Sequence, residues 1–258
     1  MGLIVDTGGM PRVRAYAHRG GAGEATENSL AAFSRAVDLG YTHLETDIRP
    51  TRDGVALLHH DASLGRTTDG HGPVRDTTWE GVRRLTLADG STPLRLEELF
   101  EAFPDVHVNV DVKEDGSIPA LVEAVQRCQA WQRVCITSFS PGRLRRVRSL
   151  IPAGTPTSAH PWEVAALRLA ATGAPLPRVP VRPRRIQIPM RALGLGLATP
   201  DVIALAHRHG LAVDVWTIDD EVDMEALIDL GVDGIMTDHP TRLRSVLERR
   251  GLWGSGGE

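Results

Sequence analysis

Short runs of apolar and β-branched residues alternate with longer amphipathic stretches from one end of the sequence to the other. This alternation predicts β-strands separated by α-helices. The expected strands cover Arg14–His18, His43–Arg49, His107–Lys113, Val134–Phe139, Pro156–His160, Arg185–Pro189, Ala212–Ile218 and Gly234–Thr237. Eight strand–helix units in a chain of 258 residues favour a closed α/β fold, the (β/α)8 or TIM barrel, over an open doubly wound sheet.

The stretches between these strands have helical periodicity. The expected helices cover Ser29–Leu39, Leu96–Phe103, Ile118–Trp131, Pro200–His209 and Asp223–Leu230. The last two are followed by Gly210 and Gly231, and glycine suits the C-terminal end of a helix. Residues 173–185 are instead rich in Pro and Arg, which predicts an extended loop with a basic rim, either solvated or in contact with an anionic substrate.

One strand-like run, Val55–His60, has no place in the barrel. It follows a turn too short to hold a helix, so it should fold back antiparallel on the second strand as a hairpin. With Pro50 opposite Val55, this register would pair Glu45 with His60. The next residues are rich in Asp, Gly and Thr and lack the barrel pattern. We therefore expect a single domain over residues 1–258 with an insertion at about 61–94.

Composition excludes some classes of function. The chain has 29 Lys+Arg against 33 Asp+Glu and 4% aromatic residues, so neither charge nor stacking favours nucleic-acid binding. No apolar run is long enough for a signal peptide or a membrane span, which predicts a cytoplasmic protein with no stable membrane insertion. Cys128 and Cys135 are expected to be reduced thiols. The sequence holds no indication of an oligomeric state.

Carboxylates gather late in two neighbouring strands of the predicted barrel. Glu45 and Asp47 are two residues apart and therefore point to the same face of the second strand, and Asp111 lies late in the third. The C-terminal ends of barrel strands carry the reactive groups. Three carboxylates are the ligands expected for Mg²⁺ or Ca²⁺, with water completing the shell. The alternative is that Glu45 or Asp47 pairs with an arginine at the mouth of the barrel.

Two histidines are expected beside these carboxylates, His18 at the end of the first strand and His60 at the end of the hairpin. Near neutral pH, one histidine can take a proton from a nucleophile while the other protonates a leaving oxygen. His59 alternates to the other face of the hairpin, and we expect it to be structural, as we do His43 and His107. Each catalytic candidate could by itself be an ordinary packing residue.

Arg19 and Lys113 add positive charge at the same strand ends. Together with a divalent ion, they could neutralise a phosphodiester as its phosphorus becomes five-coordinate. Lys113 also shares a strand face with Asp111, so it could simply form an ion pair with that residue. These residues together predict a metal-dependent phosphodiesterase.

Several motifs in order along the chain resemble those of the glycerophosphodiester phosphodiesterase family, within the PI-PLC-like phosphodiesterase superfamily. They are Ala17–Gly21, Glu27–Phe33, Leu44–Ile48, Thr51–Gly54, Leu58–Asp61, Leu64–Gly70, Val215–Asp219 and Ile235–Pro240. The resemblance implies a TIM barrel with a small insertion after the His-Asp pair, catalytic roles for His18 and His60, and metal ligands at Glu45 and Asp47. It further implies phosphate contacts from Arg19 and Lys113, with Trp216 lining the substrate pocket.

The implied reaction is hydrolysis of a small-molecule glycerophosphodiester to sn-glycerol 3-phosphate and an alcohol. Asp111 departs from the family, where the third carboxylate is commonly Glu. An alternative is a lysophospholipase D-like or sphingomyelinase D-like enzyme, which removes the head group of a lipid. Such enzymes generally act outside the cell or at membranes, and no apolar patch is visible in the sequence. A non-catalytic phosphate-ester binding protein is the third possibility.

Overall fold

The computed structural model describes residues 13–175 and 183–254. Its main sheet contains seven parallel strands in the spatial order β5-β4-β2-β1-β10-β9-β6. Their bounds are β1 Arg14–Ala17, β2 His43–Pro50, β4 His107–Val112, β5 Val134–Thr137, β6 Arg185–Ile188, β9 Ala212–Val215 and β10 Gly234–Thr237. Each strand was predicted from the sequence, to within a few residues at the ends.

The expected fifth barrel strand, Pro156–His160, is reduced to two single-residue bridges. Thr157 bridges Ile136 of β5, and Ser158 bridges Arg185 of β6, both in parallel. The chain makes ladder hydrogen bonds to both neighbours here, including Ser158 N to Ile136 O at 3.1 Å and Ala159 N to Arg185 O at 2.8 Å. These bonds join the two edges of the sheet and close the barrel, which confirms the predicted fold.

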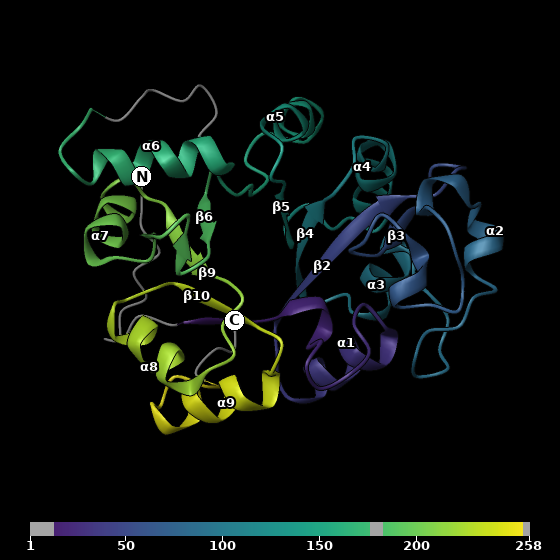
Figure 1. The fold of residues 1–258 in the computed structure, drawn as a ribbon, viewed down its shortest axis with the longest axis horizontal. Helices are drawn as coiled ribbons and strands as arrows, with labels where there is room; N and C mark the ends of the chain where they lie inside the picture. The colour runs from purple at the N-terminus through teal and green to yellow at the C-terminus, as the bar shows by residue number, and fades with distance from the viewer. Residues whose placement is uncertain (1–12, 176–182, 255–258) are drawn as a thin grey trace.

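Helices surround the barrel (Figure 1). Their bounds are α1 Leu30–Asp38, α3 Leu96–Ala102, α4 Ser117–Arg127, α5 Pro141–Leu150, α6 Pro161–Ala170, α7 Pro200–Arg208, α8 Glu221–Asp229 and α9 Pro240–Arg249. Local sequence explains where they begin, since Ser29, Ser140 and Thr199 accept a backbone hydrogen bond as N-caps. Apolar residues from the strands and from the inner helix faces form one buried core.

The hairpin forms as predicted, but its register is shifted by one residue. Strand β3, Ala56–Leu58, pairs with β2 so that Pro50 lies opposite Ala56 and Ile48 opposite Leu58. The expected pairing of Pro50 with Val55, and hence of Glu45 with His60, is therefore wrong. The reason is the turn, because Thr51 N donates to Val55 O and closes a loop of three residues rather than four.

The insertion after the hairpin contains the short helix α2, Trp79–Val82, and two single 3-10 turns, at Leu64–Arg66 and Val74–Asp76. It packs around a small apolar cluster of its own, formed by Leu57, Leu64, Val74 and Val82 with Trp79 and Leu85. The chain returns to the barrel at Arg95, which bridges Leu57 of β3. This cluster fixes the insertion against the hairpin that ends at His60.

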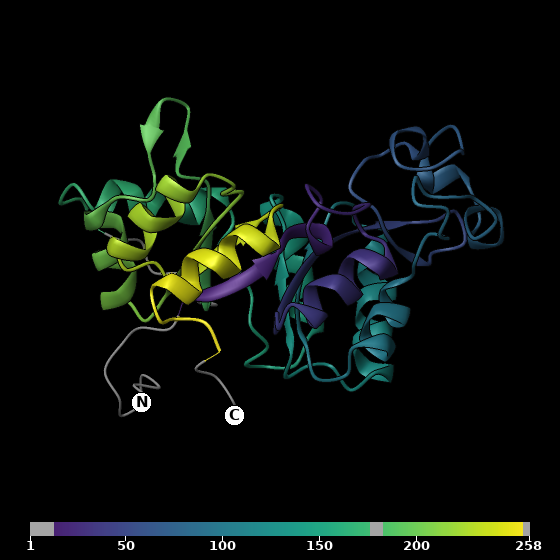
Figure 2. The ribbon, with the colours of Figure 1, turned by 90° about the horizontal axis from the view of Figure 1, so that it is seen from below.

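A second hairpin was not predicted. Strands β7, Arg191–Ala192, and β8, Leu195–Gly196, form a ribbon between β6 and α7 that projects away from the barrel (Figure 2). Much of the expected basic loop, residues 176–182, lies outside the described residues. Cys128 and Cys135 are free, as expected. Within the described part of the chain, no helix is both long enough and apolar enough to span a membrane.

Candidate active site

The C-terminal ends of the strands surround a cavity of about 900 Å³. All eight side chains proposed from the sequence line it: His18, Arg19, Glu45, Asp47, His60, Asp111, Lys113 and Trp216. By contrast, the histidines expected to be structural do not line it. His43 and His107 stack on each other at the N-terminal ends of β2 and β4, away from the cavity. The side chain of the buried His59 forms a hydrogen bond with Ser63 O.

His18 enters the cavity from a tight turn directly after β1. Arg19 and Gly20 both have positive φ, 51° and 85°, and a Cβ at Gly20 would lie 2.8 Å from the Cβ of Ala32. Glycine is therefore required where this turn passes α1. His18 Nδ1 lies 2.7 Å from Asp238 Oδ1, and its Nε2 lies 3.7 Å from Glu45 Oε2.

The charges around His18 favour its protonated form. Burial alone would lower the pKa of His18, but the negative charge of Glu45 and the hydrogen bond to Asp238 outweigh burial and raise that pKa. Burial, followed by the charge of Asp47, raises the pKa of Glu45. The His18–Glu45 pair can therefore bind a proton close to neutral pH.

Asp47 and Asp111 are buried beside two cations. Lys113 Nζ lies 2.8 Å from Asp47 Oδ1 and 2.5 Å from Asp111 Oδ2, and Arg19 Nε lies 3.0 Å from Asp47 Oδ2. Burial would raise the pKa of Asp47, but the charges of Lys113 and Arg19 lower it. Burial raises the pKa of Asp111 despite the opposing charge of Lys113. The ion pair between Lys113 and Asp111, which the sequence offered as an alternative role for Lys113, is thus present.

The carboxylates have the chemistry that a divalent ion requires. Glu45, Asp47 and Asp111 supply hard oxygen donors, and Asp111 Oδ1 is buried without a hydrogen-bond partner. Among the described residues, however, no three His, Cys, Asp or Glu side chains are already arranged around a common metal position. Lys113 occupies the space between Asp47 and Asp111, so an ion that binds both would displace its ammonium group.

His60 reaches the cavity from the end of the hairpin. Its Nδ1 lies 2.7 Å from Asp61 Oδ1, and Arg49 Nε donates to its carbonyl oxygen. Asp61 pairs with Arg66 of the insertion at 2.5 Å, and Arg66 pairs with Glu27 at 2.6 Å. This series of ion pairs fixes the hairpin and the insertion at the rim of the cavity.

Glu27 extends the same network to the other side of the site. Its Oε1 lies 3.3 Å from Arg19 Nη1, while Arg19 N donates to Glu45 Oε2 at 3.1 Å. His60 and Arg19 are thus connected through charged side chains of the insertion and of the loop before α1.

Sequence reasoning missed the residues that hold the histidines. Asp238 and Asp61 were noted within motifs, at Ile235–Pro240 and Leu58–Asp61, but no role was assigned to either. A carboxylate directly after a histidine, as in His60-Asp61, is the local signal that could have indicated this role. Asp238 is 220 positions from His18, so only the barrel, which pairs β1 with β10, brings the two together.

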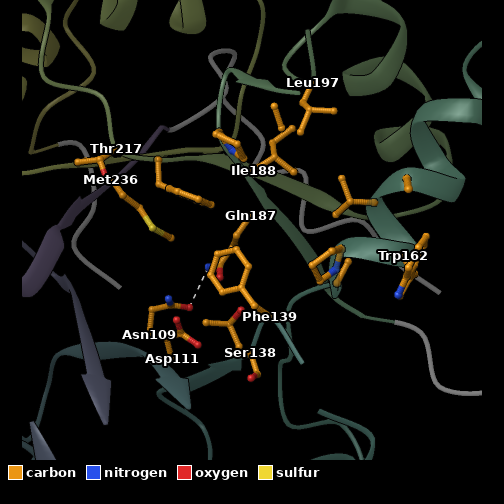
Figure 3. A pocket seen from close by; sticks show the side chains of 18 of the residues that line it. Asn109, Asp111, Ser138, Phe139, Trp162, Gln187, Ile188, Leu197, Thr217 and Met236 are labelled. Carbon is orange, nitrogen blue, oxygen red and sulfur yellow. Dashed lines mark hydrogen bonds between the residues drawn. The ribbon is translucent and has the colours of Figure 1, made fainter. Parts of the chain in front are cut away.

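The remainder of the cavity is mostly apolar. Trp216 follows β9 and makes an edge-to-face contact with Phe139, with ring centroids 5.7 Å apart. Gln187 and Asn109 hydrogen-bond each other at 2.8 Å across the barrel. Figure 3 shows these two residues and Asp111 in one part of the cavity, with Ile188, Leu197 and Trp162 around the other. The site is thus polar at the strand ends of the first half-barrel and apolar beyond Phe139.

Comparison with known proteins places this site in a family. The model of the glycerophosphoryl diester phosphodiesterase family matches residues 18–242. The protein called probable glycerophosphodiester phosphodiesterase 2 of Mycobacterium tuberculosis is 37% identical over 93% of this chain and 92% of its own length. Lysophospholipase D GDPD1 of Rattus norvegicus is 29% identical over 91% of this chain and 86% of its own length.

A solved structure has the same fold. The glycerophosphodiester phosphodiesterase of Agrobacterium tumefaciens superposes with a TM-score of 0.76 at 23% identity, covering 90% of this chain and 99% of the other. The family match extends from His18 through Arg242 and so includes every site residue described above. The chain therefore belongs to the glycerophosphoryl diester phosphodiesterase family of phosphoric diester hydrolases.

Proposed function

We propose that this protein hydrolyses glycerophosphodiesters to sn-glycerol 3-phosphate and an alcohol, using a divalent metal ion and two histidines. The observation that carries the proposal is that His18 and His60, from different elements, line one cavity with three buried carboxylates. Membership of the family supports the substrate class. The substrate is thus a small molecule, and the cytoplasmic location expected from the sequence stays a prediction.

The reaction needs two proton transfers. The oxygen of water bonds to phosphorus, and the bond between phosphorus and the alcohol oxygen breaks. One histidine takes a proton from the water, and the other gives a proton to the departing oxygen. Asp238 and Asp61 each lie 2.7 Å from Nδ1 of His18 and His60, respectively. An ionised carboxylate accepts a hydrogen bond from Nδ1–H, which leaves Nε2 of each ring for these transfers.

Arg19 and Lys113 are proposed to contact the phosphate. Both line the cavity, and both already neutralise buried carboxylates there. An anionic substrate would compete with Asp47 for these cations, and their fixed positive charge would stabilise the charge that builds up on the phosphoryl oxygens. Trp216 is proposed to contact the substrate on the apolar side of the same space.

Glu45, Asp47 and Asp111 are proposed to hold the metal ion, Mg²⁺ or Ca²⁺, because all three offer carboxylate oxygens. When bound, the ion would supply Lewis-acid polarisation and neutralise phosphate charge. Asp111 is one methylene shorter than the Glu common in the family. Asp111 also forms an ion pair with Lys113, and this pair is the reason to test the third ligand separately.

Release of sn-glycerol 3-phosphate from a panel of glycerophosphodiesters tests the proposal, with Mg²⁺, Ca²⁺ or a chelator present. We expect metal-dependent turnover of at least one diester. Absence of turnover for every diester with added metal would refute the enzyme assignment. Activity that persists in His60→Ala would instead show that the hairpin histidine has no part in proton transfer.

A further inference from the structure

Glu27 takes no part in the proton transfers proposed above, although it opens one of the family-like motifs of the sequence. It does not line the cavity, and its side chain is 13% exposed. Both of its carboxylate oxygens nevertheless contact arginines. Burial would raise the pKa of Glu27, but the hydrogen bond from Arg66 and the charge of Arg19 lower it. Glu27 is therefore an ionised group beside the active site.

The backbone around Glu27 is fixed to the turn after β1 and to β2. The next residue, Asn28, has a positive φ of 56°, a conformation that asparagine tolerates better than most residues. Its N donates to Arg19 O at 2.9 Å, and its Oδ1 accepts a hydrogen bond from Thr46 Oγ1 at 2.7 Å. Thr46 is buried and lies on β2 between the two carboxylates of that strand. The loop that carries Glu27 is thus held against the site from two sides.

Two carboxylates hold Arg19 at once. Its Nε lies 3.0 Å from Asp47 Oδ2, and its Nη1 donates to Glu27 Oε1 at 3.3 Å. The substrate phosphate would compete with Asp47 for this guanidinium. Because Glu27 lies outside the cavity lining, its contact with Arg19 can persist while the phosphate is bound. A guanidinium that is already oriented loses less conformational entropy when it binds an anion.

Arg66 of the insertion lies between Glu27 and Asp61. It donates to Glu27 from Nη1 at 2.6 Å and from Nη2 at 2.8 Å, and to Asp61 from Nε at 2.5 Å and from Nη2 at 3.2 Å. Paired contacts of this kind fix the orientation of a guanidinium as well as its position. Asp61 in turn lies 2.7 Å from His60 Nδ1. A change at Glu27 would therefore reach His60 through Arg66 and Asp61.

We propose that Glu27 is a positioning residue for both sides of the site. It orients Arg19 for the phosphate. Through Arg66 and Asp61 it also holds His60 for proton transfer. The proposal rests on the function proposed above, and it gives the insertion a task in catalysis, because Arg66 connects the insertion to the loop before α1. A displacement of about 1 Å at a reacting group can cost about 10²-fold in rate, so this support should be measurable.

The test compares Glu27→Gln with Glu24→Gln. Glu24 is the matched control, because it lies in the same loop, is 15% exposed and pairs with Arg35 at 2.7 Å, an arginine that is 48% exposed like Arg66. The pair formed by Glu24 contacts Thr241 of α9 rather than a residue of the cavity. Turnover of glycerophosphocholine is measured with saturating Mg²⁺ or Ca²⁺, and thermal unfolding shows whether each variant keeps its fold.

For Glu27→Gln, we expect kcat to fall by about tenfold or more and KM to rise by at least about twofold, because His60 and Arg19 both lose support. Glu24→Gln should keep both constants at their wild-type values. Glu27→Asp, which keeps the charge on a shorter side chain, should restore part of the loss. Equal kcat and equal KM in the two Gln variants would overturn the proposal.

Two further variants separate the route to His60 from the contact with Arg19. Arg66→Gln should lower kcat but leave KM unchanged, because Arg19 keeps its contact with Glu27. In an Asp61→Asn background, Glu27→Gln should lower kcat by about twofold or less, since the route is already broken, and should still raise KM. A tenfold loss of kcat that persists in this background would contradict the route through Arg66.

The outcomes separate this proposal from the function on which it rests. If the wild type cleaves no diester, the function proposed above fails, and the role of Glu27 fails with it. If the wild type is active and Glu27→Gln behaves like Glu24→Gln, only the positioning role is overturned. If Glu27→Gln does not fold, the half-exposed Arg66 decides: a lower kcat at unchanged KM in Arg66→Gln supports the proposal, and an unchanged kcat overturns it.

Discussion

The two ends of the cavity are built in opposite ways. At the polar end, Asp47 and Asp111 are buried and form ion pairs with Lys113, and Asp238 and Asp61 contact the rings of His18 and His60. At the apolar end, Leu193 and Trp162 contact little of the protein and are largely exposed. A buried charge without a partner costs several kcal/mol, so the polar end must be pre-organised, whereas exposed apolar groups can wait for a ligand.

The difference assigns different tasks to the two ends. Pre-organised charge stabilises a transition state, because the protein does not have to rearrange as charge develops. Apolar surface adds affinity in proportion to the area buried and has little directional preference. Substitutions at the polar end should therefore reduce the rate of the chemical step, and those at the apolar end should act on substrate preference.

The largest effect is expected for His18→Ala. Loss of a group that transfers a proton should lower kcat on glycerophosphocholine by about 10²–10⁴-fold. The exposed His209 provides a matched control, and His209→Ala should keep wild-type activity. Thermal unfolding of both variants shows whether the fold is intact. A fall of less than tenfold in an intact His18→Ala protein would exclude His18 from proton transfer.

The insertion should depend on its own apolar cluster. Leu64 is 1% exposed and packs with Val74 and Val82. Leu64→Ala should lower the free energy of unfolding by about 2–5 kcal/mol, measured by urea denaturation, because it leaves a cavity. The exposed Leu150 is the comparison, and Leu150→Ala should change stability by about 0.5 kcal/mol or less. Equal effects of the two substitutions would mean that the cluster contributes nothing.

Asp61→Asn tests whether the partner of His60 positions the ring. The amide keeps the size of the side chain but removes the charge that holds Nδ1 and Arg66. We expect kcat to fall by about tenfold or more with a smaller change in KM. Asp76→Asn is the control, since Asp76 is an exposed carboxylate of the same insertion. An unchanged kcat for Asp61→Asn would show that His60 needs no such partner.

The smallest effect on stability is expected at the apolar end. Leu193 is fully exposed at the tip of the β7–β8 hairpin. Leu193→Ser should change the free energy of unfolding by about 0.5 kcal/mol or less, since no buried contact is lost. A clear loss of stability would mean that the hairpin leucines support the fold, and the contrast between the two ends would disappear.

Much of the polar end could be predicted from the sequence because each of its proposed residues lies near the end of a predicted strand. Glu45 and Asp47 are two residues apart on one strand, and a parallel barrel places strand ends together whatever the details of packing. The same reasoning failed for the hairpin register, which depended on whether Thr51 belongs to the turn or to the ladder. Asp238 could not be paired with His18 without knowing that β10 lies beside β1.

The apolar end could not be predicted for a different reason. Trp162 and Leu169 lie on an amphipathic helix, where apolar residues ordinarily face the core. Only the path of the chain through the β7–β8 hairpin shows that they face a cavity instead. The fifth barrel strand was likewise predicted in the right place but at too great a length, since only Thr157 and Ser158 bridge its neighbours.

The most direct test of the polar end is a metal titration. Protein freed of metal by a chelator is assayed for release of sn-glycerol 3-phosphate from glycerophosphocholine as Mg²⁺ or Ca²⁺ is added back, for the wild type and for Asp111→Asn. The proposed metal site requires an activity loss of at least about 10²-fold without metal, full recovery on addition, and a higher metal requirement in the variant. Full activity in protein that elemental analysis shows to be metal-free would contradict it.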